Sequence, residues 1–435
     1  MSVRQENVKW VDGLRGIASV LVVFTHLARA FDEDLFKSTS AEHASPRLLQ
    51  YPIIRILVQG RIGVSIFSLV TGYVCALKPI RQFAAGSHEA AFTGIAKSAF
   101  RRTPRLFLPT TIATTLIWFL CQFGIFEVAN RVEGWWLNYT SPNITPYIGQ
   151  AIKMLILNII TTWTREWNVY DNNQWTLMHL LKGAFLVYVM LFATAYMKPR
   201  YRMMTSMGLF TYYYISNDSA FGMQFFFGTF LCDLSQHPPH IAWMNSRKWP
   251  ERYLAPVLIL IGLILASYPE HKPEWMRWSN YMLELSKWIF PRDPEVPRFY
   301  SGLGLEFIAL GIHFSSPVKT VLSNKYLLWF GKNSFAVYLL HGSLLRWILV
   351  WMLYGVSPPG EIVKPDGSRA PAPNFKQCGR LRWYFWLPIW FVIVYAAANM
   401  WTKHVDPFCA RLTQRLEAYV FEEKEVTQEK KLLPQ

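Results

Sequence analysis

Long apolar runs separated by short polar loops cover most of the chain up to residue 402. A helix needs about 20 mostly apolar residues to cross a bilayer, and residues 106–126 and 383–402 contain no Asp, Glu, Lys or Arg. The pattern predicts an all-α fold, a polytopic membrane helix bundle with about ten transmembrane helices. The other eight predicted helices lie near residues 11–30, 57–77, 174–197, 203–217, 218–233, 253–269, 299–315 and 326–353.

An eleventh apolar run, residues 151–163, is too short to cross a membrane unaided. About 13 helical residues reach only about 20 Å at a rise of about 1.5 Å per residue, and Lys153 interrupts the run. We predict that this run is a re-entrant or interfacial helix.

Basic residues indicate the orientation of the bundle. Short cytoplasmic loops are enriched in Lys and Arg, and the loop over residues 78–105 holds six of these residues against one acid, Glu89. We therefore expect this loop, and with ten spans both chain termini, to be cytoplasmic. The loop over residues 127–148 is then lumenal, and its sequons make Asn138 and Asn143 candidates for N-glycosylation.

Composition and charge fit this architecture. Of the residues, 52% are hydrophobic and only 17% are charged, whereas soluble proteins have about 25% charged residues. A net charge of +16 would suggest nucleic acid in a soluble protein, but here the basic residues flank apolar runs. We expect membrane lipids and no nucleic acid as partners, and an anionic, phosphate-rich ligand is compatible. The five scattered cysteines form no CxxC, and we expect no metal site.

The chain shows no polar linker long enough to separate two folded domains. The first apolar span is followed by further spans, so it should be an uncleaved anchor. We predict one transmembrane domain over residues 1–416 and a charged cytoplasmic tail over residues 417–435.

The first predicted span carries an arginine and a histidine. Arg15 and His26 are eleven residues apart, which is about 1100° at about 100° per residue, so both lie on one helical face roughly 16 Å apart along the axis. Ionisable residues inside spans usually face the bundle interior and mark a functional path. The alternative is a snorkelling arginine and a hydrogen-bonded packing histidine, and the spacing alone leaves both possibilities open.

A second basic motif, RRTPRLFLP, begins at Arg101, where the third predicted span enters the membrane. Arg102 and Arg105 are three residues apart, so they are neighbours on one side of a helix. Guanidinium groups offer planar, bidentate donors that suit phosphate. The alternative is an ordinary basic flank of a membrane helix.

Taken together, these motifs resemble those of membrane-bound acyltransferase family 3. The segment VDGLRGIASVLVVFTHL is similar to the family's opening D-x-L-R-G-[IL]-A…H, with Arg15 and His26 at its R-x10-H spacing, and Arg102-Thr-Pro-Arg105 matches its R-x-x-R element. The residues of these segments are most similar to those of filamentous-fungal members. Three further segments are similar to later family motifs and follow in family order: GRIGVSIFSLVTGYV (60–74), FFFGTFLCDL (225–234) and FGKNSFAVYLLH (330–341).

The chain also departs from the family pattern. Ser68 and Thr71 stand where Phe and Ser are usual. Family members often open a middle span with W-[ST]-[LI]-x-x-E, but here Leu180 occupies the position of the carboxylate. Glu306 lies within a later span and can supply an acid from another helix, or it can be paired with an interior Lys or His. The role of the missing carboxylate is therefore open.

The resemblance implies a reaction and the residues that perform it. The family transfers short acyl groups, often acetyl, from acyl-CoA, a co-substrate, to a hydroxyl or an amine. The resemblance implies that Arg15, Arg102 and Arg105 bind the phosphates of acyl-CoA and that His26 is the general base. A covalent acyl-histidine intermediate is less favoured.

Three further residues are given supporting roles by the resemblance. Asp12, three residues before Arg15, can hold its guanidinium in place. Tyr338 and His341 are three residues apart on a late helix and can line the acceptor side, although His341 is equally well explained as a packing residue.

The resemblance to fungal members also suggests an acceptor and a location. We expect an O-acetyltransferase acting on a hydroxyl of a secondary metabolite, with a cell-wall or lipid-linked glycan as the alternative, in the endoplasmic reticulum or another endomembrane. Two other classes are a multi-pass transporter of an anionic solute and a noncatalytic family member. The sequence shows no repeated halves of the kind that inverted-repeat transporters have.

Overall fold

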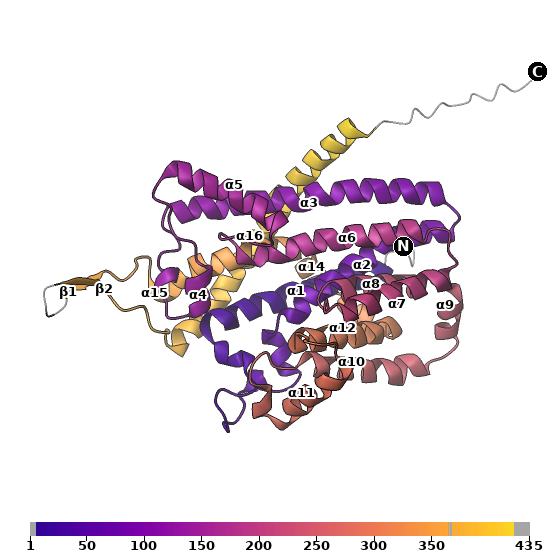
Figure 1. Cartoon of the computed structure of the whole chain (residues 1–435), viewed down its shortest axis with the longest axis horizontal. Coiled ribbons are helices and arrows are strands. Elements are labelled where there is room, and N and C mark those ends of the chain that lie inside the picture. Colours follow the sequence, from indigo (N-terminus) through magenta and orange to yellow (C-terminus); the bar gives the residue numbers. More distant parts are fainter. Residues whose placement is uncertain (1–5, 364, 366–367, 422–435) are drawn as a thin grey trace, which may run out of the picture.

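The structure is a computed structural model that describes residues 6–363, 365 and 368–421. The long helices run roughly along the longest axis of the molecule (Figure 1). The first half of the described chain forms α1 (Glu6–Phe31), α2 (Arg61–Ala84), α3 (His88–Gln122), α4 (Trp135–Thr140), α5 (Ile148–Thr164), α6 (Trp175–Ala193), α7 (Pro199–Ile215) and α8 (Gly222–Gln236). The second half forms α9 (Pro238–Asn245), α10 (Ala255–Ala266), α11 (Arg277–Ile289), α12 (Val296–Phe314), α13 (Ser316–Leu322), α14 (Lys325–Leu344), α15 (Val350–Tyr354) and α16 (Arg380–Val420).

A small β-hairpin interrupts this helical architecture. Its strands β1 (Glu361–Val363) and β2 (Arg369–Pro371) pair antiparallel, with Ile362 opposite Ala370. The hairpin projects from one end of the bundle, and α9 lies at the opposite end (Figure 1). We name these the hairpin end and the α9 end. The predicted helical bundle is confirmed, and this hairpin is the sheet within the described residues.

Six helices in the described residues are long and apolar enough to cross a membrane, namely α1, α2, α3, α6, α14 with its extension to Tyr354, and α16. The pair Pro238–Asn245 and Pro250–Ala266, bent by 85°, can count as a seventh span. The predicted helices near 203–217, 218–233 and 253–269 are present as α7, α8 and α10, but these have only 17, 15 and 12 residues. The structure supports a polytopic membrane protein, whereas the count of ten spans and the cytoplasmic termini stay predictions.

Helix α5, predicted as a non-crossing helix, has 17 residues and lies along α3. Its last turn reaches Phe107 of α3, with a distance of 5.9 Å between the ring centroids of Phe107 and Trp163. Gln174, just before α6, is already back at the level of Thr114. The hydroxyl of Thr114 donates a hydrogen bond to Gln174 Oε1 at 3.0 Å. Since Thr114 lies nearer the hairpin end than Phe107, the chain turns back after α5. This course is the one expected of a helix that enters the bundle without crossing it.

Glycines allow α1 to pack against α13 and α14 at nearly backbone contact. A Cβ atom at Gly331 of α14 would overlap the carbonyl oxygen of Asp12, and one at Gly16 of α1 would lie 2.6 Å from the carbonyl oxygen of Leu327. Small residues are the usual means of close helix approach in membranes. This contact brings the polar side chains of α1 against those of α14.

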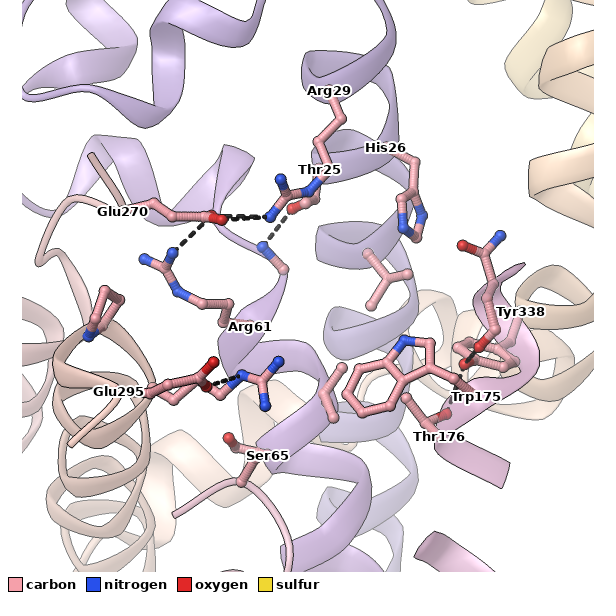
Figure 2. A pocket seen from close by; sticks show the side chains of 17 residues that line it. Thr25, His26, Arg29, Arg61, Ser65, Trp175, Thr176, Glu270, Glu295 and Tyr338 are labelled. Carbon is pink, nitrogen blue, oxygen red and sulfur yellow. Dashed lines mark hydrogen bonds and ion pairs between the residues drawn. The ribbon is translucent and has the colours of Figure 1, made fainter. Parts of the chain in front are cut away.

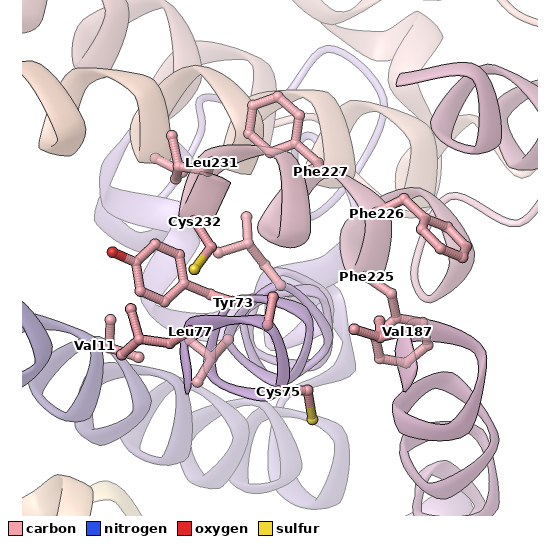
Figure 3. Close-up of a cluster of buried hydrophobic side chains, with 14 of the residues drawn as sticks. Val11, Tyr73, Cys75, Leu77, Val187, Phe225, Phe226, Phe227, Leu231 and Cys232 are labelled. Atoms are coloured by element: carbon pink, nitrogen blue, oxygen red, sulfur yellow. The ribbon is translucent and has the colours of Figure 1, made fainter. Parts of the chain in front are cut away.

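An apolar core around α2 packs against the other side of α1, away from α14. Tyr73 and Leu77 of α2 pack among Phe225 and Leu231 of α8 and Val187 of α6 (Figure 3). The five cysteines are free, and four are buried in cores of this kind, namely Cys75, Cys121, Cys232 and Cys409. These four are packing residues.

The predicted boundary between domain and tail falls inside α16, which continues to Val420. Glu417 is buried, and its carboxylate binds Arg101 of α3, with 2.7 Å from Nη2 to Oε1. The first residues of the predicted tail are therefore attached to the bundle. Residues 422–435 of that tail lie outside the described residues.

The two sequons occupy exposed positions in and after α4. Both asparagines contact Asn130: its side-chain amide donates to Asn143 Oδ1 at 2.9 Å, and its carbonyl accepts from Asn138 Nδ2 at 2.6 Å. Their glycosylation stays a prediction.

Candidate active site

Two cavities lie beside α1. The larger, about 520 Å³, has Arg15, Arg102 and Arg105 in its lining, and we name it the arginine cavity. The smaller, about 260 Å³, has His26 in its lining, and we name it the histidine cavity. Arg15 precedes His26 on α1, which starts at the α9 end (Figure 1), so the arginine cavity lies toward that end. Tyr338 of α14 lines both cavities.

The structure brings the three predicted phosphate-binding arginines together. Arg15 Nη2 donates to Ser334 Oγ at 3.3 Å, and its Nη1 lies 3.5 Å from Asp12 Oδ1. Asp12 is half-exposed, and so long a contact between partly exposed charges contributes little energy. Arg102 Nη2 donates to Thr71 Oγ1 at 3.3 Å, so Thr71 supplies a hydroxyl where the family usually has Ser.

The lining of the arginine cavity is strongly basic. A cavity with one sign of charge and low-dielectric walls concentrates ligands of the opposite sign. The only acid in this lining, among the described residues, is Asp406 of α16. The basic residues in the lining are Arg15, Lys78, Arg101, Arg102, Arg105 and Lys332.

The hydrogen bonds of two histidines fix which nitrogen of His26 is free to accept a proton. His341 Nδ1 lies 2.8 Å from the Val337 carbonyl oxygen, and His341 Nε2 lies 2.8 Å from His26 Nδ1. A carbonyl oxygen only accepts, so His341 carries its proton on Nδ1 and, when neutral, accepts at Nε2. His26 must then donate from Nδ1, which leaves the lone pair of its Nε2 available.

The ring of His26 points into the histidine cavity (Figure 2). It is held between His341 and Trp136, with ring-centroid distances of 5.0 and 5.3 Å. His341 is fully buried and lies behind His26 rather than in the cavity lining. The expectation that His341 lines the acceptor side therefore needs correction: its ring contacts the predicted base instead.

Thr25, the neighbour of His26, places the start of α2 beside the histidine. Its hydroxyl donates to the Val58 carbonyl oxygen at 3.0 Å and accepts from the Gly60 amide. A Cβ atom at Gly60 would come within 2.6 Å of the same hydroxyl, so the close approach requires glycine. This contact brings Arg61, the first residue of α2, to the cavity.

Arg61 and Arg29 share one carboxylate on the wall of the histidine cavity (Figure 2). Glu270, in the loop after α10, accepts from Arg29 Nη2 at 2.8 and 2.9 Å and from Arg61 Nη1 at 2.7 Å. Burial alone would raise the pKa of Glu270, but Arg61 and Arg29 outweigh it and hold the pKa below its usual value. Glu270 is therefore ionised at neutral pH.

Tyr338 forms part of the wall between the two cavities. Its hydroxyl donates to the Asn173 carbonyl oxygen, so the hydroxyl of Thr176, 2.6 Å away, donates to it in turn. Its ring meets Phe67 edge to face at 6.2 Å between centroids. Ser334, Tyr338 and His341 recur at helical spacing on α14, and each contacts one of the two cavities or a residue that lines them.

A comparison with known protein families agrees with the family resemblance of the sequence motifs. The model of the acyltransferase 3 family, described as an acyltransferase domain, matches residues 8–403. The chain belongs to the acyltransferase 3 family. The predicted resemblance, and the prediction that the chain is an enzyme of the acyltransferase class, are confirmed.

Three relatives of this acyltransferase come from fungi. It is similar to O-acetyltransferase PaAT-1 of Phomopsis amygdali, with 24% identity over 78% of this chain and 72% of that protein. It is similar to acyltransferase R4 of Phoma sp., with 22% identity over 78% of this chain and 83% of that protein. Acyltransferase clz18 of Cochliobolus lunatus is 28% identical over 27% of this chain and 30% of its own length. No solved structure matches the acyltransferase significantly.

Some predicted residues of the acyltransferase lie away from its site. Glu306 lines neither cavity; it is buried, and its Oε1 accepts from Gln224 Nε2 at 2.9 Å. It is therefore hydrogen-bonded inside the bundle to an amide and not, within the described residues, to the interior Lys or His of the alternative interpretation. Leu180, in the position of the family carboxylate, lines the arginine cavity, and the adjacent His179 instead contacts Glu166 at 2.8 Å.

The charged wall of the histidine cavity was not predicted from the sequence. Arg29 follows His26 by three residues on α1, so helical spacing would have indicated it. Glu270 and Arg61 carry no comparable signal, because they reach the cavity from a loop and from the first turn of another helix. In the described residues, no three His, Cys, Asp or Glu side chains lie close enough to hold a metal ion.

Proposed function

We propose that this acyltransferase moves an acetyl or other short acyl group from acyl-CoA to a hydroxyl of a small molecule. The observation that carries the proposal is the shared wall at Tyr338, where a basic cavity adjoins a cavity containing His26. Similarity to an O-acetyltransferase over most of the chain supports a hydroxyl as the acceptor.

The arginine cavity is the proposed donor site. Coenzyme A carries a pyrophosphate and a 3′-phosphate, and Arg15, Arg102 and Arg105 offer forked donors for these groups. The thin acyl-pantetheine arm would then extend along α1 from Arg15 toward His26, which lies roughly 16 Å further along the helix axis. Its thioester would arrive near Tyr338.

His26 is the proposed general base. Its Nε2 takes the proton from the acceptor hydroxyl while the hydroxyl oxygen attacks the thioester carbon. The new C–O bond forms, the C–S bond breaks, and the departing sulfur of coenzyme A takes the proton from His26. The products are an ester and free coenzyme A, and His26 returns to its neutral form.

The proposed setting is the endoplasmic reticulum or another endomembrane. The α9 end then faces the cytosol, the source of acyl-CoA, and the hairpin end with Asn138 and Asn143 faces the lumen. The proposed acceptor class is a hydroxylated secondary metabolite, as for an enzyme that resembles fungal O-acetyltransferases.

Purified full-length enzyme, isotope-labelled acetyl-CoA and an extract of cells that carry the protein would test the proposal. We expect free coenzyme A to be released and the label to enter a compound whose mass increases by one acetyl group. The His26→Gln variant should give neither. If the wild-type enzyme gives neither signal above the level of a protein-free control, the proposal is refuted.

A further inference from the structure

The lining of the histidine cavity contains more positive than negative charge. The positive groups are Arg29, Arg61 and Arg298, and the negative groups are Glu270 and Glu295. His26 in its neutral form, which the proposed role as a base requires, adds no charge to this lining. One positive charge is therefore left without a balancing carboxylate in the lining.

The ion pairs show how that excess arises. Glu270 is shared between Arg29 and Arg61, with all three contacts between 2.7 and 2.9 Å. Glu295 pairs separately with Arg298, 2.7 Å from its Nε. Another carboxylate near Arg298, that of Asp218, lines neither cavity and accepts instead from the backbone amides of Phe221 and Gly222.

The guanidinium groups also have donor capacity left. Arg61 Nε is buried and has no hydrogen-bond partner among the described residues. Each guanidinium has five N–H donors in a planar fork; Arg298 uses its Nε on Glu295, and Arg29 uses its Nη2 on Glu270. A buried donor without a partner is costly, and a carboxylate or phosphate is the partner that satisfies both the charge and the geometry.

The excess charge lies close to the proposed base. Arg29 follows His26 by three residues on α1, so their Cα atoms are separated by about 4.5 Å along the helix axis. Arg61 lies opposite Arg29, across Glu270 (Figure 2). An anion held by these arginines would place a hydroxyl a few bonds away at His26 Nε2.

We infer that the acyl acceptor carries an anionic group, a carboxylate or a phosphate, close to the hydroxyl that is acylated. This inference rests on the proposed function and narrows its acceptor to a small hydroxylated anion, or to a larger molecule that presents such a group. Arg29 and Arg61 bind the anion, with Arg298 at the side of the cavity formed by α12.

An anion-exchange experiment tests this inference. A soluble extract of cells that carry the protein is separated into a retained, anionic fraction and a neutral flow-through. Each fraction is incubated with purified full-length enzyme and labelled acetyl-CoA. We expect labelling of compounds in the retained fraction. Equal or faster labelling of the flow-through overturns the inference but not the proposed function, whereas no labelling and no coenzyme A release with either fraction overturn both.

Chemical treatment of the retained fraction identifies the anionic group. Phosphatase removes a phosphate acceptor, and methyl esterification removes a carboxylate acceptor. If labelling disappears after only one of the two treatments, that treatment identifies the anionic group of the acceptor. Labelling that persists after both treatments contradicts an anionic acceptor.

Variants test the assignment of the arginines. Arg61→Gln and Arg298→Gln should each raise KM for the retained acceptors by about 10- to 100-fold, the loss expected for one charge-assisted contact. Arg47→Gln is the matched control, since Arg47 also pairs with a carboxylate, Asp32, but lines neither cavity. If the variant at the partly buried Arg61 does not fold, the variant at the half-exposed Arg298 still decides the result. An unchanged KM overturns the assignment.

Discussion

The two cavities differ in how Arg15 and Arg102 on one side, and Arg29 and Arg61 on the other, are held. In the arginine cavity, Arg15 and Arg102 make contacts of 3.3–3.5 Å, two of them to neutral hydroxyls. In the histidine cavity, Arg29 and Arg61 make carboxylate contacts of 2.7–2.9 Å. Loosely held guanidinium groups are available for a polyanionic ligand, whereas paired ones keep a fixed shape. The difference suggests that the first cavity accommodates a flexible polyanion, whereas the second holds its charged groups in a fixed geometry that selects its ligand.

The proposed orientation places the arginine cavity toward the cytosol and the histidine cavity toward the lumen, and it predicts an all-or-none labelling result. Single cysteines at Ala90, in the basic loop, and at Asn138, in the sequon loop, should react with impermeant thiol reagents from opposite sides. We expect labelling of position 90 from the cytosol and of position 138 from the lumen, because basic residues concentrate in the former loop. Labelling of position 90 only from the lumen would contradict the orientation.

The largest kinetic effect is expected in the histidine cavity. His26→Gln should lower turnover by about 10²–10⁴-fold, the usual range for a lost general base, while coenzyme A binding is kept. Arg15→Ala should instead weaken coenzyme A binding. Transfer rates and equilibrium binding on the purified variants check this split. Near wild-type transfer by His26→Gln would make His26 a packing residue.

Donor affinity tests the arginine cavity. Replacing Arg102 or Arg105 with Ala should weaken coenzyme A binding by about 10- to 100-fold, because each removes a charge-assisted contact. The loss should shrink at high salt, since these side chains border solvent. Binding isotherms at two salt concentrations measure both effects. If the double variant binds the donor normally, these arginines serve only to orient the protein in the membrane.

The packing that aligns the two cavities can be tested through stability. Gly331→Ala should destabilise the fold by about 1–3 kcal/mol, the usual cost of overpacking, because the new methyl group meets the backbone of Asp12. Gly360→Ala is the matched control, since a Cβ atom there has no neighbour within 4 Å. Thermal unfolding in detergent compares the two. Equal stability would mean that α1 and α14 can separate without cost.

The smallest effect concerns pH. The pKa of Glu270 lies below its usual value of 4.5, because Arg61 and Arg29 outweigh the opposing effect of burial. A carboxyl group of this kind stabilises the fold above its unfolded pKa, and that stability is lost as pH falls through the folded pKa. We therefore expect unfolding to become easier as pH decreases below about 4.5.

The matched variants assign this pH dependence. Glu270→Gln should be less stable at neutral pH, since two partly buried arginines lose their carboxylate, but it should lose less stability on acidification. Glu42→Gln removes an exposed carboxylate and should behave like wild type. Identical acid sensitivity in all three proteins would show that Glu270 does not contribute to it.

Sequence patterns were sufficient for features that lie within one helix. The shared face of Arg15 and His26 follows from helical geometry alone, and the short length of the run at 151–163 already indicated a helix that does not cross. Contacts between distant helices have no such signal. The pairing of His26 with His341, 315 residues away, depends on the register of α1 against α14, which glycine contacts determine.

Loop residues were equally hard to anticipate. Glu270 reaches the histidine cavity only because the loop after α10 folds back toward α1, where its carboxylate contacts Arg29. Glu306 was the more visible candidate in the sequence, since it interrupts an apolar run, yet it faces Gln224. An acidic residue inside a membrane span indicates that it has an interaction partner, but the sequence does not identify that partner.

Tyr338, which lines both cavities, also has a consequence for the membrane as a permeability barrier. In the proposed mechanism an acyl group passes this side chain while coenzyme A stays on one side and the acceptor on the other. Ions and protons must not follow the same route. In the proposed mechanism, the hydrogen bonds of Tyr338 to Asn173 and Thr176 would hold its side chain between the two cavities. A smaller residue at this position should then open a path for ions across the membrane.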